Sequence, residues 1–270
     1  MRLIAAFLAC LLAAPAAAED SPLERLSTGD AGRAWEAVGR LDVGGESFCT
    51  AALVAPDLVL TAAHCLFATG TGRQMDLGGI KFLAGWRDGR ASAYRGIRQV
   101  AIHPGYDPMA REPREVVPSD VALLRLDAPI RSTRILPFEV AAPSRDVALG
   151  VVSYAAGRAE APSIQRSCEL IARHGSMFVT SCEAEFGASG APIFDFASGR
   201  PRIVSVVSAK ARSGGRPVAL GADAGAALPQ LAAMLGTAGG VFAREPAGIA
   251  IRRVGEVDGR ETTGAKFLKP

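Results

Sequence analysis

The stretch Thr61-Ala62-Ala63-His64-Cys65 says most about the fold of this 270-residue chain. Its first residue, Thr61, ends an apolar run over 58–61 that predicts a β-strand, so His64 is expected to lie at a strand end. The two alanines are small enough for a tight turn against a core, and Cys65 can tie that turn to a strand carrying Cys49. We therefore expect the histidine to be held in one place.

Two later motifs supply a carboxylate and a hydroxyl. Asp120 opens Asp120-Val121-Ala122-Leu123-Leu124-Arg125-Leu126, an apolar run, and a carboxylate that enters the interior needs a hydrogen-bonding partner. Ser189 lies in Gly187-Ala188-Ser189-Gly190-Ala191-Pro192. Taken alone, the first is also a common turn aspartate and the second a common glycine-serine turn. The earlier His64 favours a catalytic interpretation of both.

These three residue types suit nucleophilic catalysis. A serine hydroxyl is a weak nucleophile near neutral pH, so an imidazole must accept its proton and a carboxylate must orient that imidazole. We assign these roles to Ser189, His64 and Asp120. The order histidine, aspartate, serine favours a two-barrel fold over an α/β-hydrolase, in which the serine comes first. Gly187 frees the backbone to turn, and the N–H groups of Gly187 and Ser189 are the expected oxyanion donors.

Short apolar runs bounded by Gly, Pro and Asp recur along the chain and predict an all-β sandwich or barrel. The first series covers 48–54, 58–61, 81–84, 97–102 and 121–126, and the second covers 147–153, 167–172, 177–182, 193–194, 202–209 and 217–220. Residues 129–143 are rich in proline and polar positions and are expected to cross between two lobes. The spacing of Leu228, Leu231 and Met234 predicts a helix over 226–235.

The chain begins like an exported protein. Arg2, an apolar run over 3–14 and small residues before Glu19 predict a cleaved signal peptide. The run is shorter than the roughly 20 residues that span a bilayer, so we expect no stable membrane anchor and a periplasmic or secreted location. The expected organisation is a signal peptide at 1–18, an N-terminal segment at 19–34, a first barrel lobe at 35–130, a second lobe with the helix at 131–236 and a tail of uncertain order at 237–270.

Four cysteines remain after the signal peptide, which allows three disulfide pairings in an oxidising compartment. We favour the local pairs Cys49 with Cys65 and Cys168 with Cys182. Each closes a loop of about 15 residues, for which chain entropy gives roughly 3 kcal/mol. A zinc site is the alternative, but the spacings lack a Cys-x-x-Cys pair.

Composition narrows the class of partner. The chain is 49% hydrophobic and 21% charged, as is typical of a globular protein. Its 30 basic and 27 acidic residues give a net charge of +3, and the basic residues are scattered. This pattern gives no case for nucleic-acid binding. We expect no metal and no cofactor.

The motifs together resemble the trypsin-like (chymotrypsin-fold) serine proteases over residues 35 to about 209. The matching segments are Trp35-Glu36-Ala37-Val38-Gly39, Phe48-Cys49, Leu60-Thr61-Ala62-Ala63-His64-Cys65, His103-Pro104-Gly105-Tyr106, Asp120-Val121-Ala122-Leu123-Leu124 and Gly187-Ala188-Ser189-Gly190-Ala191-Pro192. The resemblance implies two six-stranded antiparallel β-barrels with the active site between them, peptide-bond hydrolysis through an acyl-enzyme, and the Cys49 to Cys65 disulfide.

One departure from that family is informative. Its animal members carry an aspartate immediately before the serine, which pairs with a new N-terminus after zymogen cleavage. Here Ala188 occupies that position, and no Ile-Val-Gly-Gly segment precedes Trp35. The pairing cannot form, so we expect that any maturation is signal removal alone, or at least does not use the trypsin mechanism. Ala188 and the upstream cysteine resemble bacterial trypsin-like and glutamyl-endopeptidase-like members.

The sequence leaves substrate specificity open. In the family the base of the specificity pocket lies six residues before the nucleophile, which implies Glu183 and a preference for Lys or Arg. The implied pocket wall includes Ser208 and Lys210, and a lysine there would attract acidic side chains or neutralise Glu183. Both charges are also typical of solvent-facing strand ends.

The leading interpretation is an exported serine endopeptidase that acts on peptides or proteins. A protease-like binding module that has lost turnover is the first alternative, although all three catalytic residue types are present. An esterase of another fold is the second, and the Gly-x-Ser-x-Gly elbow that it requires is missing around Ser189.

Overall fold

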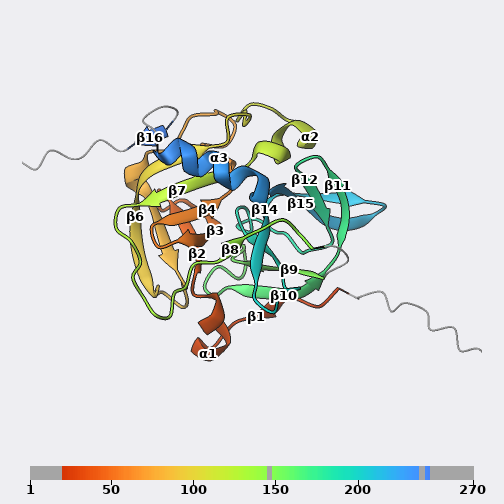
Figure 1. Cartoon of the computed structure of the whole chain (residues 1–270), viewed down its shortest axis with the longest axis horizontal. Helices are drawn as coiled ribbons and strands as arrows, with labels where there is room; N and C mark the ends of the chain where they lie inside the picture. The colour runs from red at the N-terminus through yellow and green to blue at the C-terminus, as the bar shows by residue number, and fades with distance from the viewer. Residues whose placement is uncertain (1–19, 145–147, 237–240, 244–270) are drawn as a thin grey trace, which may run out of the picture.

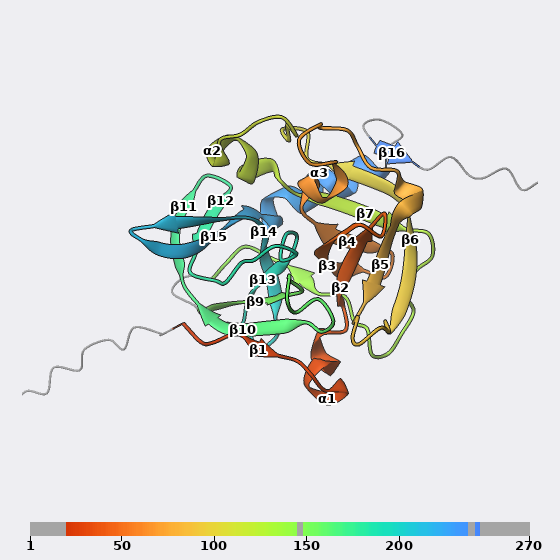
Figure 2. The same cartoon turned by 180° about the vertical axis from the view of Figure 1, so that it is seen from behind.

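The structure, a computed structural model, describes residues 20–144, 148–236 and 241–243. It consists mainly of β-strands arranged in two lobes that lie side by side (Figure 1). The sequence prediction of an all-β, two-barrel fold with a C-terminal helix is confirmed. Figure 2 shows the same two lobes from behind, with β1 (Glu24–Arg25) below β10 (Ser163–Cys168).

The first lobe is a closed barrel. Its strands are β2 (Val38–Val43), β3 (Ser47–Ala55), β4 (Leu58–Thr61), β5 (Ile80–Ala84), β6 (Ala93–Ile102) and β7 (Ala122–Leu126). The ring closes because β6 pairs with both β5 and β7, while β2 pairs with both β3 and β5. The aliphatic side chains of these strands are buried inside the ring, which accounts for the apolar runs in the sequence.

The second lobe follows the order β10, β9, β13, β14, β15, β12 along its sheet, with β1 beside β10, β11 beside β12 and β8 beside β14. Its strands are β8 (Glu139–Val140), β9 (Leu149–Ser153), β10 (Ser163–Cys168), β11 (Leu170–His174), β12 (Met177–Thr180), β13 (Pro192–Asp195), β14 (Arg202–Ser213) and β15 (Arg216–Asp223). The ends of β10 and β12 meet where the Ser181 N–H donates to the Glu169 carbonyl at 3.0 Å. The Cys168–Cys182 disulfide joins the same two ends.

Short helices connect the strands. They are α1 (Gly29–Gly32), the 3₁₀ turns η1 (Arg33–Trp35), η2 (Ala63–Leu66), η3 (Leu77–Gly79) and η4 (Val117–Ser119), and α2 (Pro113–Val116). The C-terminal helix α3 (Ala224–Gly236) packs against β14 of the second lobe and β6 and β7 of the first (Figure 1). It therefore braces both lobes. No helix in the described part of the chain is long and apolar enough to cross a membrane.

Two sequence expectations need correction. Strand β2 is absent from the predicted runs because Arg40 and Asp42 alternate with buried residues, which hides a barrel strand among polar positions. The run predicted over 167–172 is not one strand, since β10 ends at Cys168 and β11 begins at Leu170.

The predicted termini are described only in part. Within the expected tail at 237–270, Val241–Ala243 forms strand β16, which pairs with β6. The remainder of that tail and the predicted signal peptide at 1–18 lie outside the described residues.

Four aromatic rings pack together next to the second lobe. Phe194 of β13 is fully buried, with ring centroids 5.1 Å from Trp35 and 4.8 Å from Phe138. Phe196 stands edge-on to Trp35 at 6.3 Å. These rings come from the N-terminal turn η1, the crossover between the lobes, and β13 with the residues directly after it, so they join three distant segments of the chain.

We predict that Phe194→Ala destabilises the protein by about 3–5 kcal/mol, because it removes a buried ring and leaves a cavity. The free energy of unfolding from urea titration measures the effect. Leu136→Ala is the matched control, since Leu136 is 63% exposed. A Phe194→Ala variant as stable as the Leu136→Ala variant would show that the cluster contributes nothing to the fold.

Candidate active site

His64 and Asp120 form a hydrogen-bonded pair at one end of the first barrel. His64 lies in η2, directly after β4, and Asp120 follows η4 and precedes β7. Strands β4 and β7 are neighbours, so their registered ends bring the two residues together. The His64 Nδ1 atom lies 2.7 Å from Asp120 Oδ2, and the His64 backbone N–H donates to Oδ1 at 2.8 Å. One carboxylate therefore fixes both the backbone and the ring of His64.

Asp120 is 1% exposed and receives a third donor from the second lobe. The Ser208 hydroxyl donates to Asp120 Oδ2 at 2.5 Å, and Ser208 also lines the cavity beside His64. A buried carboxylate is costly unless hydrogen bonds replace its water. Three donors meet that need.

The same contacts set the basicity of His64. Burial by itself would lower the pKa of the imidazole, but the charge of Asp120 and its hydrogen bond outweigh burial and raise the pKa above the ordinary value of 6.5. Because Nδ1 faces the carboxylate, Nε2 is the ring nitrogen left to exchange a proton with a substrate or nucleophile.

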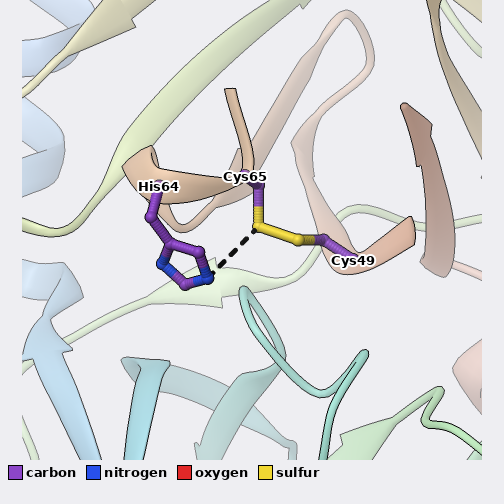
Figure 3. Close-up of side chains that lie close together, drawn as sticks. All are labelled: Cys49, His64 and Cys65. Atoms are coloured by element: carbon purple, nitrogen blue, oxygen red, sulfur yellow. Dashed lines mark hydrogen bonds between the residues drawn. A yellow bond between two sulfur atoms is a disulfide. The ribbon is translucent and has the colours of Figure 1, made fainter. Parts of the chain in front are cut away.

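The Cys49–Cys65 disulfide stands beside the other edge of the imidazole. Figure 3 shows Nε2 of His64 facing Cys65, and the Sγ atom lies 4.0 Å away. Cys49, His64 and Cys65 are the one three-residue group among the described residues with ligand atoms close enough for a metal. The two sulfurs are bonded to each other at 2.03 Å, so they cannot act as thiolate ligands. Their role here is to hold the turn that carries His64.

The loop that carries Ser189 is docked onto β3 through Thr50. The Thr50 N–H donates to the Ser189 carbonyl at 2.8 Å, and the Thr50 hydroxyl donates to the Gly187 carbonyl at 2.9 Å. Thr50 follows Cys49, whose disulfide partner follows His64. The loop is thereby held against the strand ends that position the imidazole.

Gly190 makes this close docking possible. A Cβ atom at Gly190 would lie 2.2 Å from both the Thr50 carbonyl and the Thr61 hydroxyl, and the residue has a φ of +79°. Any larger residue would push the Ser189 loop away from β3.

In the described part of the chain the Ser189 hydroxyl has no hydrogen-bond partner, and the contact between His64 Nε2 and Ser189 Oγ that a catalytic triad uses is not formed.

Two backbone N–H groups beside Ser189 are available as donors. The N–H of Ala188 donates to the Glu185 carbonyl at 2.8 Å, and that of Gly190 donates to the Val207 carbonyl at 2.7 Å. The N–H groups of Gly187 and Ser189 have no acceptor among the residues that the structure describes. Gly187 adopts a φ of +94°, and a Cβ there would clash with Phe48 at 2.4 Å. This backbone can therefore present two neighbouring donors to an anion.

A cavity of about 660 Å³ opens next to this loop. Residues that follow β12, including Glu183 and Glu185, line one side, and Lys210 of β14 lines the other. The structure thus brings two of the expected pocket residues, Glu183 and Lys210, to one cavity. A smaller cavity of about 250 Å³ is lined by His64, Asp120 and Ser208.

The charges around the larger cavity are unequally paired. The Lys210 ammonium lies 2.7 Å from a Glu185 carboxylate oxygen and 4.7 Å from the Phe186 ring centre. The Glu183 carboxylate has no ion-pair or hydrogen-bond partner among the described residues. The guanidinium of Arg212 donates to the Gly215 carbonyl instead, and that of Arg158 donates to Ser153. Lys210 is therefore neutralised by Glu185 and not by Glu183.

The comparison with known families agrees with this arrangement. The sequence profile described as Trypsin matches residues 28–217. The chain belongs to the trypsin family. This membership supports a serine-type peptidase in general and confirms the resemblance drawn from the motifs.

A solved structure shares the fold. It is described as a Glu endopeptidase in complex with MPD, and it superposes with a TM-score of 0.64 at 17% sequence identity. The match covers 80% of this chain and 96% of that one. At this identity the likeness establishes the two-barrel architecture. Disulfides on such a fold are typical of extracellular proteins.

Sequence reasoning missed two residues of this trypsin-family site. Thr50 carries the Ser189 loop, and Gln165 accepts the Glu183 N–H at 2.7 Å. Only the position of Thr50 next to Cys49 could have drawn attention to it. Nothing in the sequence around Gln165 marks its contact.

We predict that the acid limb of kcat/KM lies above pH 6.5, because His64 must be neutral to accept a proton and its pKa is raised. Asp120→Asn removes the charge that raises this pKa, while burial remains. The limb should therefore move to lower pH, and the plateau should fall by about 10⁴-fold. A pH profile of kcat/KM and an NMR titration of the imidazole measure the two effects. His103→Gln is the control, and an Asp120→Asn profile with an unmoved limb would contradict the assignment.

Proposed function

We propose that this trypsin-family chain is an exported serine endopeptidase that hydrolyses peptide bonds through an acyl-enzyme, with His64, Asp120 and Ser189 as its catalytic residues. The observation that supports this most is the docking of the Ser189 loop on Thr50, next to an imidazole whose Nδ1 is held by buried Asp120. Nucleophile, base and orienting carboxylate then converge from both lobes.

Acylation requires the Ser189 hydroxyl to reach Nε2 of His64, a contact that is not formed in the described structure. Ser189 Oγ attacks the scissile carbonyl carbon while Nε2 of His64 accepts the hydroxyl proton. Asp120 stabilises the resulting imidazolium, and its third donor, Ser208, keeps the carboxylate in place. His64 then gives the proton to the leaving amine, the C–N bond breaks and Ser189 is left as an ester.

The oxyanion is stabilised by the backbone. The N–H groups of Gly187 and Ser189 have no other acceptor among the described residues, so they are free to bind the negative oxygen of the tetrahedral intermediate. Each such donor is worth about 2.7–4 kcal/mol of transition-state stabilisation. Water activated by His64 then hydrolyses the ester by the same steps in reverse, and Ser189 is regenerated.

The pocket charges favour basic substrates. Lys210 is paired with Glu185, whereas the Glu183 carboxylate lines the 660 Å³ cavity and makes no hydrogen bond or close ion pair among the described residues, although its charge acts on the Arg158 guanidinium. A Lys or Arg side chain at the residue before the scissile bond would supply the direct ion pair that Glu183 lacks in the described structure. We therefore propose that the enzyme cleaves after Lys or Arg.

Activation does not need an N-terminal ion pair. Ala188 is fully buried and offers no carboxylate, so a new α-amino group would have no partner there. We propose that signal removal completes maturation in the periplasm or outside the cell. An inactive binding module remains the alternative, and active-site labelling separates the two.

We predict that a small fluorophosphonate labels Ser189 and that Ser189→Ala abolishes both labelling and peptide hydrolysis, because only an activated hydroxyl displaces the fluoride. Intact-mass spectrometry and peptide mapping locate the adduct. Ser167→Ala is a control on an ordinary serine. Labelling that persists in Ser189→Ala would refute the nucleophile, and a folded wild type that no serine-directed probe modifies would favour the binding module.

We predict that peptides with Lys or Arg before the scissile bond are the best substrates and that Glu183→Gln lowers their kcat/KM by about 10- to 150-fold, the range for losing a hydrogen bond to a charged group. Kinetics with matched Lys, Glu and Ala peptides measure this preference. Glu139→Gln, at an exposed position on β8, is the control. A preference for Glu, or a Lys preference that survives Glu183→Gln, would rule out this pocket assignment.

A further inference from the structure

Residues 20–26 lie along the second lobe next to the 660 Å³ cavity. Its strand β1 (Glu24–Arg25) pairs with β10, and Leu26 is fully buried. The Ser181 hydroxyl, on a residue that lines the cavity, donates to Asp20 at 2.6 Å. The segment therefore touches the pocket wall as well as the sheet.

Ser21 satisfies an irregularity in β10. The register between β10 and β9 shifts between Gln165 and Cys168, which takes Arg166 and Ser167 out of the ladder. The N–H groups of both residues donate to the Ser21 hydroxyl oxygen at 2.9 Å, and the Ser21 N–H donates to the Ser167 carbonyl at 2.9 Å. Without Ser21 these backbone groups would lose their partners.

Gln165 connects this segment to the pocket. Its side chain amide donates to the Ser21 carbonyl at 3.1 Å, and its oxygen accepts the Glu183 N–H at 2.7 Å. A carbonyl only accepts and an N–H only donates, so the two partners fix the orientation of the amide. Gln165 is 5% exposed and lines the cavity. A buried amide with both ends satisfied is a rigid link between its neighbours.

We propose that residues 20–26 act as a strut for the specificity pocket and that Gln165 is the positioning residue that transmits this support to Glu183. The inference rests on the proposed function, because Glu183 is the group that binds the substrate side chain. Ala188 removes the carboxylate through which an N-terminus could order the pocket from the nucleophile side. The contacts through Ser21 and Gln165 order the same pocket from β10 with neutral hydrogen bonds.

The strut predicts a selective loss of binding. Gln165→Leu keeps a side chain of similar size but removes both hydrogen bonds, and Ser21→Ala removes the acceptor for the two β10 N–H groups. Each should raise KM at least tenfold for a peptide with Lys before the scissile bond. The same variants should change KM less than twofold for a matched Ala peptide, because Ala does not reach Glu183. The kcat values should stay within twofold, since His64 and Asp120 are untouched.

The test measures kcat and KM for both peptides in the full chain, together with the rate of fluorophosphonate labelling. Thr28→Ala is the matched control, because it removes a side-chain hydrogen bond near the same segment, to the Ala31 N–H, away from the pocket. Circular dichroism and a urea midpoint establish that each variant folds, and Ser21→Ala carries the test if Gln165→Leu does not fold.

Two failures are distinguishable. If the wild type is labelled normally but the variants change KM equally for the Lys and Ala peptides, or for neither, the strut is overturned and the proposed function stands. A wild type that neither labels nor cleaves would overturn the proposed function and the strut with it.

Discussion

The hydrogen bonds of Thr50 are the interaction on which the site depends. This fully buried residue of β3 accepts the Tyr154 N–H at 3.0 Å and donates its hydroxyl to the Gly187 carbonyl at 2.9 Å. Its N–H donates to the Ser189 carbonyl. A single side chain and its backbone thus hold two segments of the second lobe against the first. Because a buried hydroxyl without partners is costly, this joint favours one relative position of the two lobes.

Charge and packing support each other at the joint. Asp120 lies at one end of the first barrel, directly before β7, yet one of its three donors, Ser208, comes from β14 of the second lobe. The carboxylate has all three donors only when the lobes are docked, and the docked lobes in turn hold the Ser189 loop against β3. The elevated pKa of His64 is a consequence of the same geometry, since burial alone would lower it. Catalytic electrostatics and lobe docking are therefore coupled.

The sequence predicts the local features of the fold and misses the long-range ones. Apolar runs reveal β4, β7 and β14 because their side chains fill the barrels, and the short motifs around His64 and Ser189 carry their own turn chemistry. The contact between Thr50 and Gly187 spans 137 residues, and that between Ser208 and Asp120 spans 88. Such contacts depend on which strands become neighbours, and periodicity along one strand does not encode that. The sequence therefore predicts Ser208 only as a pocket-wall residue and does not reveal its hydrogen bond to Asp120.

Neutral hydrogen bonds of Ser21 and Gln165, and not an ion pair with a chain terminus, hold the Glu183 side of the cavity, and this affects how the pocket responds to pH. An α-amino group titrates near pH 8, so a pocket ordered by a terminal ion pair would lose that order in alkaline solution. The amide of Gln165 and the hydroxyl of Ser21 do not titrate in this range, and their partners are backbone groups. We expect the acid limb to belong to His64, whereas the hydrogen bonds of Ser21 and Gln165 persist across this pH range. Under the proposed function, the alanine at position 188 thereby separates the ionisation of His64 from the hydrogen bonds that order the Glu183 side of the cavity.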